Sequence, residues 1–446
     1  MQLDAALAKL GEYPFVVVAW VDDAGYPVSV ATTFQTDAAA GRVLLDLPQP
    51  PIPTDREIEL VGSHIRPQPG VGYDERRYVS IWGRASEAGA DGVAFTPQRA
   101  WGWDEQEVPF FEYSERSVPQ SRRYLERLSE ERGVPVRPRL DFGWLVLRTT
   151  RLPFLTATLV PVFLGLAIAA RHGAFDWLTA LLTLIGASLA HLAINVTNDI
   201  FDEHFGADPA NTNPTQFSGG SRVVFYGLLS MRQLSLVAAG LYAGAILIGL
   251  LLLAMRPSVA LLAIGLAGIV VGYSYTGPPL KLVYRGLGEI AVAVGFGPIM
   301  LLGAYVVQTG HLAVEPLIAS LPVAILIALI LYVNEIPDRR GDAAAGKRTL
   351  VVRLSPETVT RIYLVAVVLA FVLIVAGVIG GVLPWPTLLA LAAVPLAVQV
   401  YTGIQEHYNS PYTLMAVMGV NVKLHLYVGL LMLAGYLVTL ALTFLV

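Results

Sequence analysis

The stretch Asn195-Val-Thr-Asn-Asp-Ile-Phe-Asp202 ends an apolar run that begins near residue 176. A run of about twenty apolar residues is long enough to cross the ~30 Å hydrocarbon core of a bilayer. On a helix, Asn195, Asp199 and Asp202 are spaced by four and then three residues, so they share one face. The stretch therefore predicts a membrane-spanning helix that carries carboxylates at one end.

A second stretch, Asn334-Glu-Ile-Pro-Asp338, ends another apolar run and is followed by Asp342. Together with Asn198-Asp-Ile-Phe-Asp202 it fits the pattern Asn-acid-Ile-x-Asp. The two runs are an even number of predicted helices apart, so both motifs emerge on the same side of the membrane. This pattern predicts a parallel internal repeat whose two acidic faces converge.

Charge separates the chain into two parts. Residues 1–151 hold 39 charged side chains, about 26%, close to the ~25% of soluble proteins, whereas residues 152–446 hold only 25. The second part contains nine apolar runs of membrane-spanning length. They are about 152–170, 176–197, 233–254, 258–275, 286–306, 314–333, 361–381, 384–403 and 424–446. The predicted fold is an all-α polytopic membrane bundle of about nine helices, preceded by a small, mainly-β soluble domain.

Composition excludes several classes of function. The formal net charge of −4 indicates no nucleic-acid partner. The chain has no cysteine, which excludes disulfides, thiolate metal sites and cysteine nucleophiles.

We place the soluble β-barrel-like domain at 1–133, a linker at 134–150 and the membrane domain at 151–446. The first apolar run is eight residues long, is followed by two aspartates and has no basic leader, so it is not a signal peptide. Turn residues separate the runs that favour strands. The predicted elements are strands at Pro14–Val21, Tyr26–Thr33, Arg42–Leu47 and Arg77–Ala85 and an amphipathic helix at 120–132.

The order of these strands resembles the flavin-binding split barrels related to pyridoxamine-phosphate oxidase. The resemblance rests on Pro14-Phe-Val-Val-Val-Ala-Trp, Gly25-Tyr-Pro-Val-Ser-Val, Gly41-Arg-Val-Leu-Leu and Tyr78-Val-Ser-Ile-Trp-Gly-Arg-Ala. It implies an FMN cofactor whose phosphate would be held by Arg42, Arg77 and Arg84. The alternative is that these arginines are solvated strand residues.

The basic residues of the membrane domain predict its orientation. With the N-terminal domain in the cytoplasm, the cytoplasmic loops hold 11 lysines and arginines, and the opposite loops hold Arg171 and Arg256. Cytoplasmic loops carry such an excess. We therefore expect a multi-pass protein of the cell (inner) membrane whose acidic motifs face the cytoplasm.

The acidic motifs hold seven of the 12 acids of the membrane domain. Buried carboxylates of this density need cations, and all-oxygen ligands select Mg²⁺ or Mn²⁺, which typically bridges to substrate phosphates. The cytoplasmic loops supply basic residues that could bind a diphosphate: Arg222, Lys281, Arg285, Lys347 and Arg348. Two alternatives stay open. The basic residues could only determine topology, and paired intramembrane acids also occur in cation-coupled transporters.

Residues 151–446 resemble the UbiA superfamily of intramembrane aromatic prenyltransferases. The resemblance rests on four ordered motifs: the stretch from Asn195 to Asp208, Tyr275-Thr-Gly-Pro-Pro-Leu-Lys, Gly297-Pro-Ile-Met-Leu-Leu-Gly-Ala-Tyr305, and Asp338 to Leu350. They are similar to the menaquinone branch, 1,4-dihydroxy-2-naphthoate polyprenyltransferase. Two features depart from that branch, which are Glu335 in place of a second asparagine and the soluble N-terminal domain.

The resemblance implies Mg²⁺-dependent transfer of a polyprenyl group from an allylic diphosphate to an aromatic acceptor in the lipid bilayer, either 1,4-dihydroxy-2-naphthoate or the acceptor of another UbiA-type enzyme. It implies metal ligands at Asp199, Asp202, Asp208, Asp338 and Asp342. The five basic residues named above would bind the diphosphate, and Asn195 and Asn198 would orient the acids. Tyr273, Tyr275 and Tyr305 would line the acceptor pocket or serve in packing. Replacement of Asp199 or Asp338 by alanine should abolish transfer.

Overall fold

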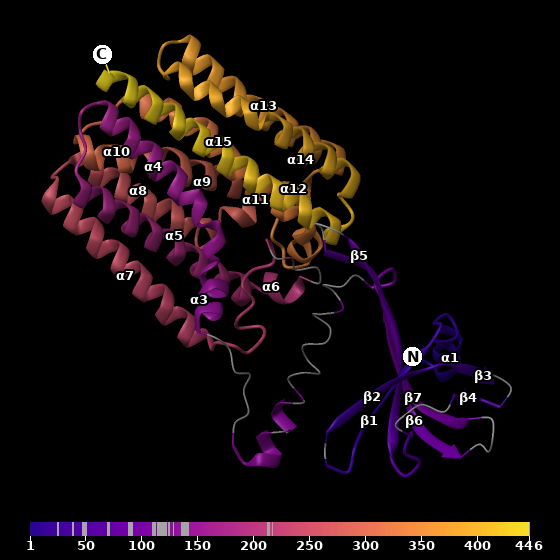
Figure 1. The fold of residues 1–446 in the computed structure, drawn as a ribbon. Helices are drawn as coiled ribbons and strands as arrows, with labels where there is room; N and C mark the ends of the chain where they lie inside the picture. Colours follow the sequence, from indigo (N-terminus) through magenta and orange to yellow (C-terminus); the bar gives the residue numbers. More distant parts are fainter. Residues whose placement is uncertain are drawn as a thin grey trace. The chain divides into compact units, whose positions relative to one another are not determined.

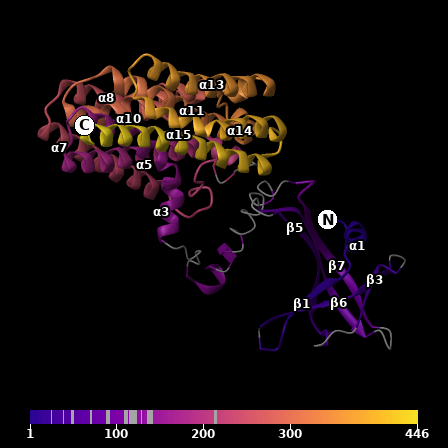
Figure 2. The ribbon, with the colours of Figure 1, turned by 45° about the horizontal axis from the view of Figure 1, so that its top comes forward.

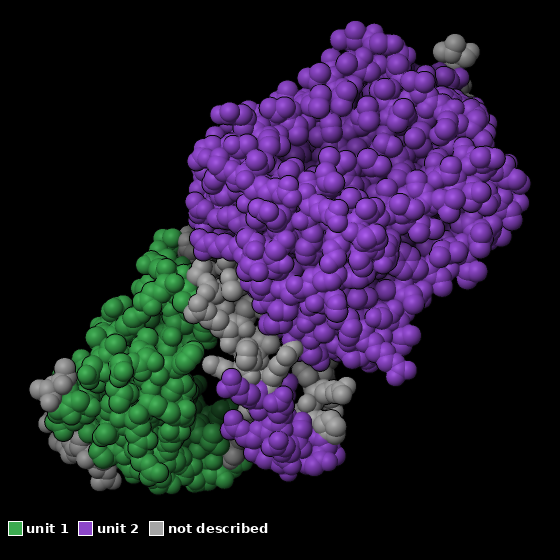
Figure 3. All heavy atoms as spheres, turned by 180° about the vertical axis from the view of Figure 1, so that it is seen from behind, with its two compact units in different colours: residues 1–116 green, residues 117–446 purple. Residues whose placement is uncertain are grey.

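The computed structural model divides into two units, Met1–Arg116 and Ser117–Val446, which Figure 3 colours separately. It describes residues 1–446 except 25, 38–39, 47–50, 69–71, 88–91, 109–112, 114–122, 124, 128, 135–141, 212–214, 216 and 446. The unit boundary precedes the predicted domain boundary at 133. The helix predicted at 120–132 and the linker predicted at 134–150 fall partly outside the described residues.

The first unit is one antiparallel seven-stranded sheet in the order β2-β1-β5-β6-β7-β4-β3, with one short helix. Its elements are α1 (Leu3–Leu10), β1 (Val16–Val21), β2 (Pro27–Thr32), β3 (Phe34–Asp37), β4 (Arg42–Leu45), β5 (Glu57–Gln68), β6 (Gly72–Glu87) and β7 (Val93–Asp104). Because β2 and β3 lie at the two ends of the order and do not pair with each other, the described sheet is an open half-barrel. The mainly-β front domain is thus confirmed, while α1, β3, β5 and β7 were not predicted.

Strand alternation builds the core of this unit. Alternate residues of β1 are buried, and Leu60, Ile81 and Phe95 from the three long strands lie beside them. On α1, Leu7 and Leu10 are buried against the same core. The helix therefore covers one face of the sheet.

The three arginines expected at an FMN phosphate do not share one face of the sheet. Ile81 on β6 is buried, so Arg77, four positions earlier, lies on the core side and Arg84 lies on the other. On β4, Arg42 alternates with buried Val43 and faces away from the core. This geometry does not support the predicted phosphate site.

The second unit is a bundle of long helices, with α13–α15 on one side and α5, α7 and α8 on the other (Figures 1 and 2). Its helices are α3 (Phe142–Thr150), α4 (Thr156–Arg171), α5 (Trp177–Phe205), α6 (Ala207–Ala210), α7 (Met231–Met255), α8 (Val259–Thr276), α9 (Gly288–Val294), α10 (Met300–Thr309), α11 (Val314–Ala344), α12 (Leu350–Arg353), α13 (Pro356–Ile379), α14 (Val394–His407) and α15 (Pro411–Leu445). Shorter 3₁₀ turns lie at Leu152–Leu155, Val283–Arg285 and Trp385–Ala393, and a π-helical turn lies at Gly295–Ile299.

Within the described residues, eight helices are long and apolar enough to cross a membrane, against nine predicted spans. The remaining predicted span, 152–170, corresponds to α4, which has only 16 residues because the 3₁₀ turn at Leu152–Leu155 takes the start of the apolar run. The last helix begins at Pro411, well before the predicted start at 424. The all-α membrane bundle is confirmed.

Two helices extend beyond their predicted ends and carry the acidic motifs as their last turns. Helix α5 has 29 residues and α11 has 31, so each is about 45 Å long at 1.5 Å per residue, longer than the ~30 Å hydrocarbon core. Helix α5 ends at Gly206, whose φ of 84° is the left-handed conformation of a helix C-terminus. Both motifs are therefore helical, as their spacing predicts. Whether the two halves superpose as a repeat stays a prediction.

Candidate active site

A cavity of about 610 Å³ lies within the second unit. One face of α5 lines it from end to end, because residues three or four apart recur along one side of a helix. These residues are Thr183, Gly186, Ala187, Ala190, His191, Ile194, Asn195, Asn198 and Asp202. Helices α7, α8, α10 and α11 supply most of the remaining wall. The cavity is polar where α5 and α11 carry their acidic motifs and is mainly apolar elsewhere.

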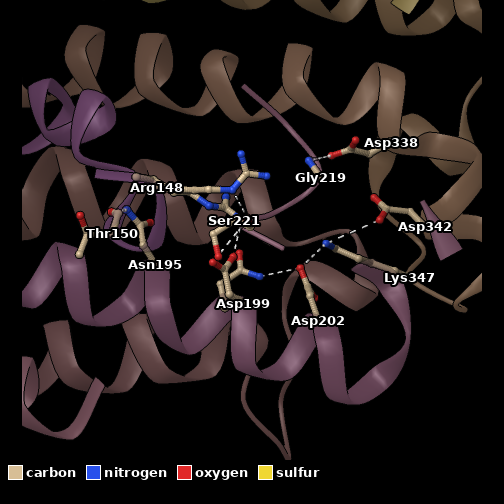
Figure 4. A network of polar contacts seen from close by, with 12 residues as sticks. Arg148, Thr150, Asn195, Asp199, Asp202, Gly219, Ser221, Asp338, Asp342 and Lys347 are labelled. Atoms are coloured by element: carbon tan, nitrogen blue, oxygen red, sulfur yellow. Dashed lines mark hydrogen bonds and ion pairs between the residues drawn. The ribbon is translucent and has the colours of Figure 1, made fainter. Parts of the chain in front are cut away.

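The side chains of Asp199 and Asp202 on α5 form ion pairs with different basic residues, of which Figure 4 labels Lys347. Asp199 is buried, pairs with the guanidinium of Arg151 and accepts a hydrogen bond from the backbone N–H of Ser221. Asp202 lies 2.9 Å from Nζ of Lys347 and accepts a hydrogen bond of 2.8 Å from the hydroxyl of Tyr284. Asp202 lines the cavity, whereas Asp199 is not among its lining residues.

The acids of α11 lie across from those of α5. Asp338 accepts hydrogen bonds from Nδ2 of Asn211 at 2.7 Å and from the backbone N–H of Gly219 at 2.9 Å. Asp342 lies 3.7 Å from Nζ of Lys347, so this lysine bridges the two motifs, as Figure 4 shows. Oδ2 of Asp342 is buried without a hydrogen-bond partner among the described residues. The structure thus brings the two acidic faces together, as the sequence predicts.

Asp208 is a further buried acid of the cavity wall, on α6. Burial raises its pKa well above the usual range, and the nearby carboxylates of Asp199 and Asp202 raise it further. A Cβ atom added at Gly220 would lie 2.5 Å from a carboxyl oxygen of Asp208, and Gly220 has a φ of 73°. Glycine at this position therefore allows the loop backbone to approach the acid closely.

Arg151 lines the cavity and was not assigned to the site from the sequence. Burial alone would lower its pKa, but Asp199, Asp208 and Asp202 raise it, so the guanidinium stays charged. In the sequence Arg151 directly precedes the first apolar run. A basic residue at such a place usually sets the orientation of the helix in the membrane, so nothing marks it as a site residue. Asn211 and Tyr284 were also missed, because their loops reach the acids only through the fold.

The acidic residues of the cavity fit a divalent cation that is also bound by a substrate. No three acidic or histidine side chains in the described part of the chain form a ready-made metal site. Asp202, Asp208, Asp338 and Asp342 nevertheless line one polar region, and the partnerless oxygen of Asp342 lies there. Mg²⁺ is typically held by one or two carboxylates together with water and substrate phosphates, which this arrangement can supply.

Of the five basic residues expected to bind a diphosphate, only Lys347 lines the cavity. Arg222 is buried and donates hydrogen bonds to the backbone carbonyls of Asp208 and Asn211, so it holds their loop. The other three lie away from the lining. Nζ of Lys281 lies 3.3 Å from the ring centroid of Phe205, and Arg285 and Arg348 are exposed.

The predicted asparagines and tyrosines fall into two groups. Asn195, Asn198 and Tyr275 line the cavity. Asn198 donates a hydrogen bond of 2.6 Å to Asp202, its neighbour one turn on, which fits the orienting role expected of it. Tyr273 is 44% exposed, and Tyr305 is buried with its hydroxyl 2.8 Å from Nδ1 of His172, the first residue after α4. Neither of these two tyrosines is among the lining residues.

The fold and the cavity define a polytopic α-helical membrane protein with a charged region above an apolar interior. The UbiA prenyltransferase family model matches residues 158–418, and the chain belongs to this family. UbiA prenyltransferases transfer prenyl groups, so the protein is an enzyme of that type. Residues 1–157 lie outside the match.

Two relatives are similar over most of their own length. The 2-carboxy-1,4-naphthoquinone phytyltransferase of Synechocystis sp. is 30% identical over 295 residues, which are 66% of this chain and 92% of the relative. The 1,4-dihydroxy-2-naphthoate octaprenyltransferase of Bacillus subtilis is 29% identical over 300 residues, which are 67% of this chain and 94% of the relative. A UbiA homologue from Archaeoglobus fulgidus, solved with GPP and Mg²⁺ bound, matches with a TM-score of 0.47 and 14% identity over 65% of this chain and 99% of its own.

Proposed function

We propose that this enzyme transfers a polyprenyl group from an allylic diphosphate to 1,4-dihydroxy-2-naphthoate or a closely related quinone precursor, with Mg²⁺. The observation that carries the proposal is the cavity, in which carboxylates and two partly buried cations adjoin a long apolar interior. A diphosphate fits the charged region and its prenyl tail fits the interior. The naphthoate relatives support the acceptor. Membership of the UbiA family leaves the cation-coupled transporter without support.

Each charged group has a role in this proposal. Asp202, Asp208, Asp338 and Asp342 would hold Mg²⁺, and Asp199 fixes Arg151 through their ion pair. The ion would supply positive charge to the departing diphosphate. Arg151 and Lys347 donate hydrogen bonds to the same oxygens from positions that the acidic residues set in advance.

The apolar interior protects the reacting prenyl carbon. Cleavage of the allylic C–O bond leaves a carbocation, which water would quench. Most lining residues of α7, α8 and α10 are isoleucine, leucine, valine, alanine or glycine, which carry no nucleophilic group. An electron-rich carbon of the aromatic acceptor then forms the new C–C bond, and the acceptor restores its aromaticity by releasing a proton, or CO₂ in place of the proton when the carbon that carries the carboxylate of dihydroxynaphthoate is prenylated.

The reaction is tested with purified full-length protein in lipid nanodiscs, Mg²⁺, labelled geranylgeranyl diphosphate and a panel of hydroxylated naphthoates and benzoates. We expect a prenylated naphthoate product and its loss on chelation of Mg²⁺. If the enzyme prenylates benzoates but no naphthoate, the proposed acceptor class is wrong and benzoates take its place. Absence of every prenylated aromatic product would refute the proposal.

Glycines in the apolar wall should determine how long a prenyl chain is accepted. An added side chain at Gly249 on α7 meets no heavy atom within 4 Å and projects from a residue of the cavity lining. We expect Gly249→Leu to lower kcat/KM for an octaprenyl donor roughly tenfold and to leave a geranyl donor within about twofold. Gly240→Leu is the matched control, because Gly240 lies on the same helix, is equally open and is not among the lining residues. Equal loss for short and long donors would contradict this prediction.

We also propose that the chain lies in the cell (inner) membrane with the N-terminal domain and the acidic motifs in the cytoplasm. The chain has no cysteine, so single cysteines report topology directly. Ser230 begins α7 on the side of the acidic motifs, and His311 lies between α10 and α11 on the other side; both are exposed. A membrane-impermeant maleimide should label His311→Cys in intact cells and Ser230→Cys only after lysis. The reverse pattern would contradict the orientation.

A further inference from the structure

His191 occupies a place in the cavity that the diphosphate chemistry does not explain. Its side chain is only 4% exposed and lines the cavity from the same face of α5 as Asn195 and Asp202. It precedes Asp199 by eight residues, which is about 12 Å along the helix. His191 therefore faces the region beyond the diphosphate site, where the acceptor must approach the prenyl group.

The contact between His191 and Thr158 fixes the tautomer of the imidazole. Nδ1 of His191 lies 2.8 Å from the hydroxyl of Thr158, a fully buried residue of α4. Within the described residues this hydroxyl has no other hydrogen-bond acceptor, so its O–H donates to Nδ1. A neutral imidazole that accepts at Nδ1 carries its proton on Nε2. Since no acidic side chain of the described residues hydrogen-bonds to the ring, the neutral form is the one expected.

The Nε2–H group belongs to a residue of the cavity wall. It has no hydrogen-bond partner among the described residues, and the ring contacts the edge of Phe296 with 4.6 Å between centroids. Phe296 lies in the π-helical turn at Gly295–Ile299, and such turns are frequent at functional sites. A donor on the cavity wall that has no partner in the protein can hydrogen-bond to an oxygen atom of a bound molecule.

We propose that His191 determines acceptor specificity: its Nε2–H donates a hydrogen bond to an oxygen of a hydroxylated aromatic co-substrate and orients the ring against Phe296. This inference rests on the proposed prenyl transfer. The prenyl tail is a hydrocarbon and offers no acceptor atom, and Asp202, the acid of α5 proposed to hold Mg²⁺ at the diphosphate, lies eleven residues or about 16 Å further along the helix. The aromatic co-substrate is therefore the reactant that can meet this donor.

The first test separates the acceptor from the donor in steady-state kinetics of the full-length enzyme. His191→Phe should raise the acceptor KM about 10- to 100-fold, the range of one hydrogen bond to a hydroxyl or a charged oxygen. It should leave the KM for geranylgeranyl diphosphate within twofold. His191→Gln keeps a side-chain N–H donor and should recover part of the loss. Thr158→Val, which removes the hydroxyl but keeps the shape, should raise the acceptor KM about threefold to tenfold.

The second test removes the partner oxygen from the acceptor instead of the histidine. Naphthoates that lack one hydroxyl at a time are compared in the wild type and in His191→Phe. The analogue that lacks the bonded oxygen should be used equally well by both enzymes, an outcome that general damage to the cavity would not produce. His425→Phe is the control, since His425 is buried on α15, lies 3.4 Å from the carbonyl of Thr156 and is not a lining residue. It should leave the acceptor KM unchanged.

The outcomes distinguish this inference from the proposed function. If the wild type is active and His191→Phe has the same acceptor KM, the role of His191 is refuted and the proposed function is not. Equal losses for every acceptor analogue also overturn that role, because they indicate a structural effect. A wild type that prenylates no aromatic acceptor refutes the proposed function itself.

Discussion

Asp338→Asn should lower Mg²⁺-dependent prenyl transfer about 10³-fold. The carboxylate of Asp338 lines the cavity, and the amide of Asn211 and the backbone N–H of Gly219 hold it in place. Asparagine keeps the shape and one of the two acceptor oxygens, but removes the negative charge that a divalent cation requires. Metal-ion charge stabilisation contributes several kcal/mol, and each 1.36 kcal/mol is a factor of ten in rate.

The measurement is the transfer rate as a function of Mg²⁺ concentration. Half-saturation should move to higher Mg²⁺ in Asp338→Asn, and Asp202→Asn should behave alike because Asp202 faces the same region. Glu406→Gln is the control, since this acid of α14 is exposed and outside the cavity. Wild-type activity with an unchanged Mg²⁺ requirement in Asp338→Asn would remove this residue from the metal site.

The acidic residues of the site could be predicted from the sequence, because the two acids of each pair are only three or four residues apart in the chain. Asp199 and Asp202 lie on one helix at a spacing of three, and Asp338 and Asp342 lie on another at a spacing of four, so helical geometry alone places each pair on one face. The predicted spans 176–197 and 314–333 nevertheless end earlier than helices α5 and α11 do. Polar residues at the end of an apolar run resemble a loop, although α5 continues until Gly206.

The sequence alone could not show which basic residues belong to the site. A lysine or arginine in a cytoplasmic loop can either determine topology or bind substrate, and the path of the loop decides between the two. Lys347 and Arg348 are adjacent, yet Lys347 bridges Asp202 and Asp342 while Arg348 is exposed. Arg222 was expected to bind substrate and instead holds the backbone around Asp208. Similarly, β5 and β7 were missed because polar residues interrupt their apolar alternation.

Replacement of Arg151 should be nearly as damaging as loss of a metal ligand. Arg151→Ala removes a partly buried guanidinium that lines the cavity and leaves Asp199 buried without its ion-pair partner. A charged donor aimed at developing charge contributes about 10²- to 10³-fold in rate. We expect kcat to fall by that factor. A separate cost to stability follows from the unpaired carboxylate.

A second substitution separates these two effects. Arg151→Ala combined with Asp199→Asn removes the uncompensated charge, so the thermal midpoint should recover while kcat stays low. Recovery of kcat together with stability would mean that Arg151 only supports the fold. Arg256→Ala is the control for loss of a positive charge, because Arg256 follows α7 at the end remote from the acidic motifs and is exposed. It should change neither kcat nor the midpoint. Arg151→Lys should restore activity only in part, since a lysine cannot present the planar pair of donors that matches a diphosphate.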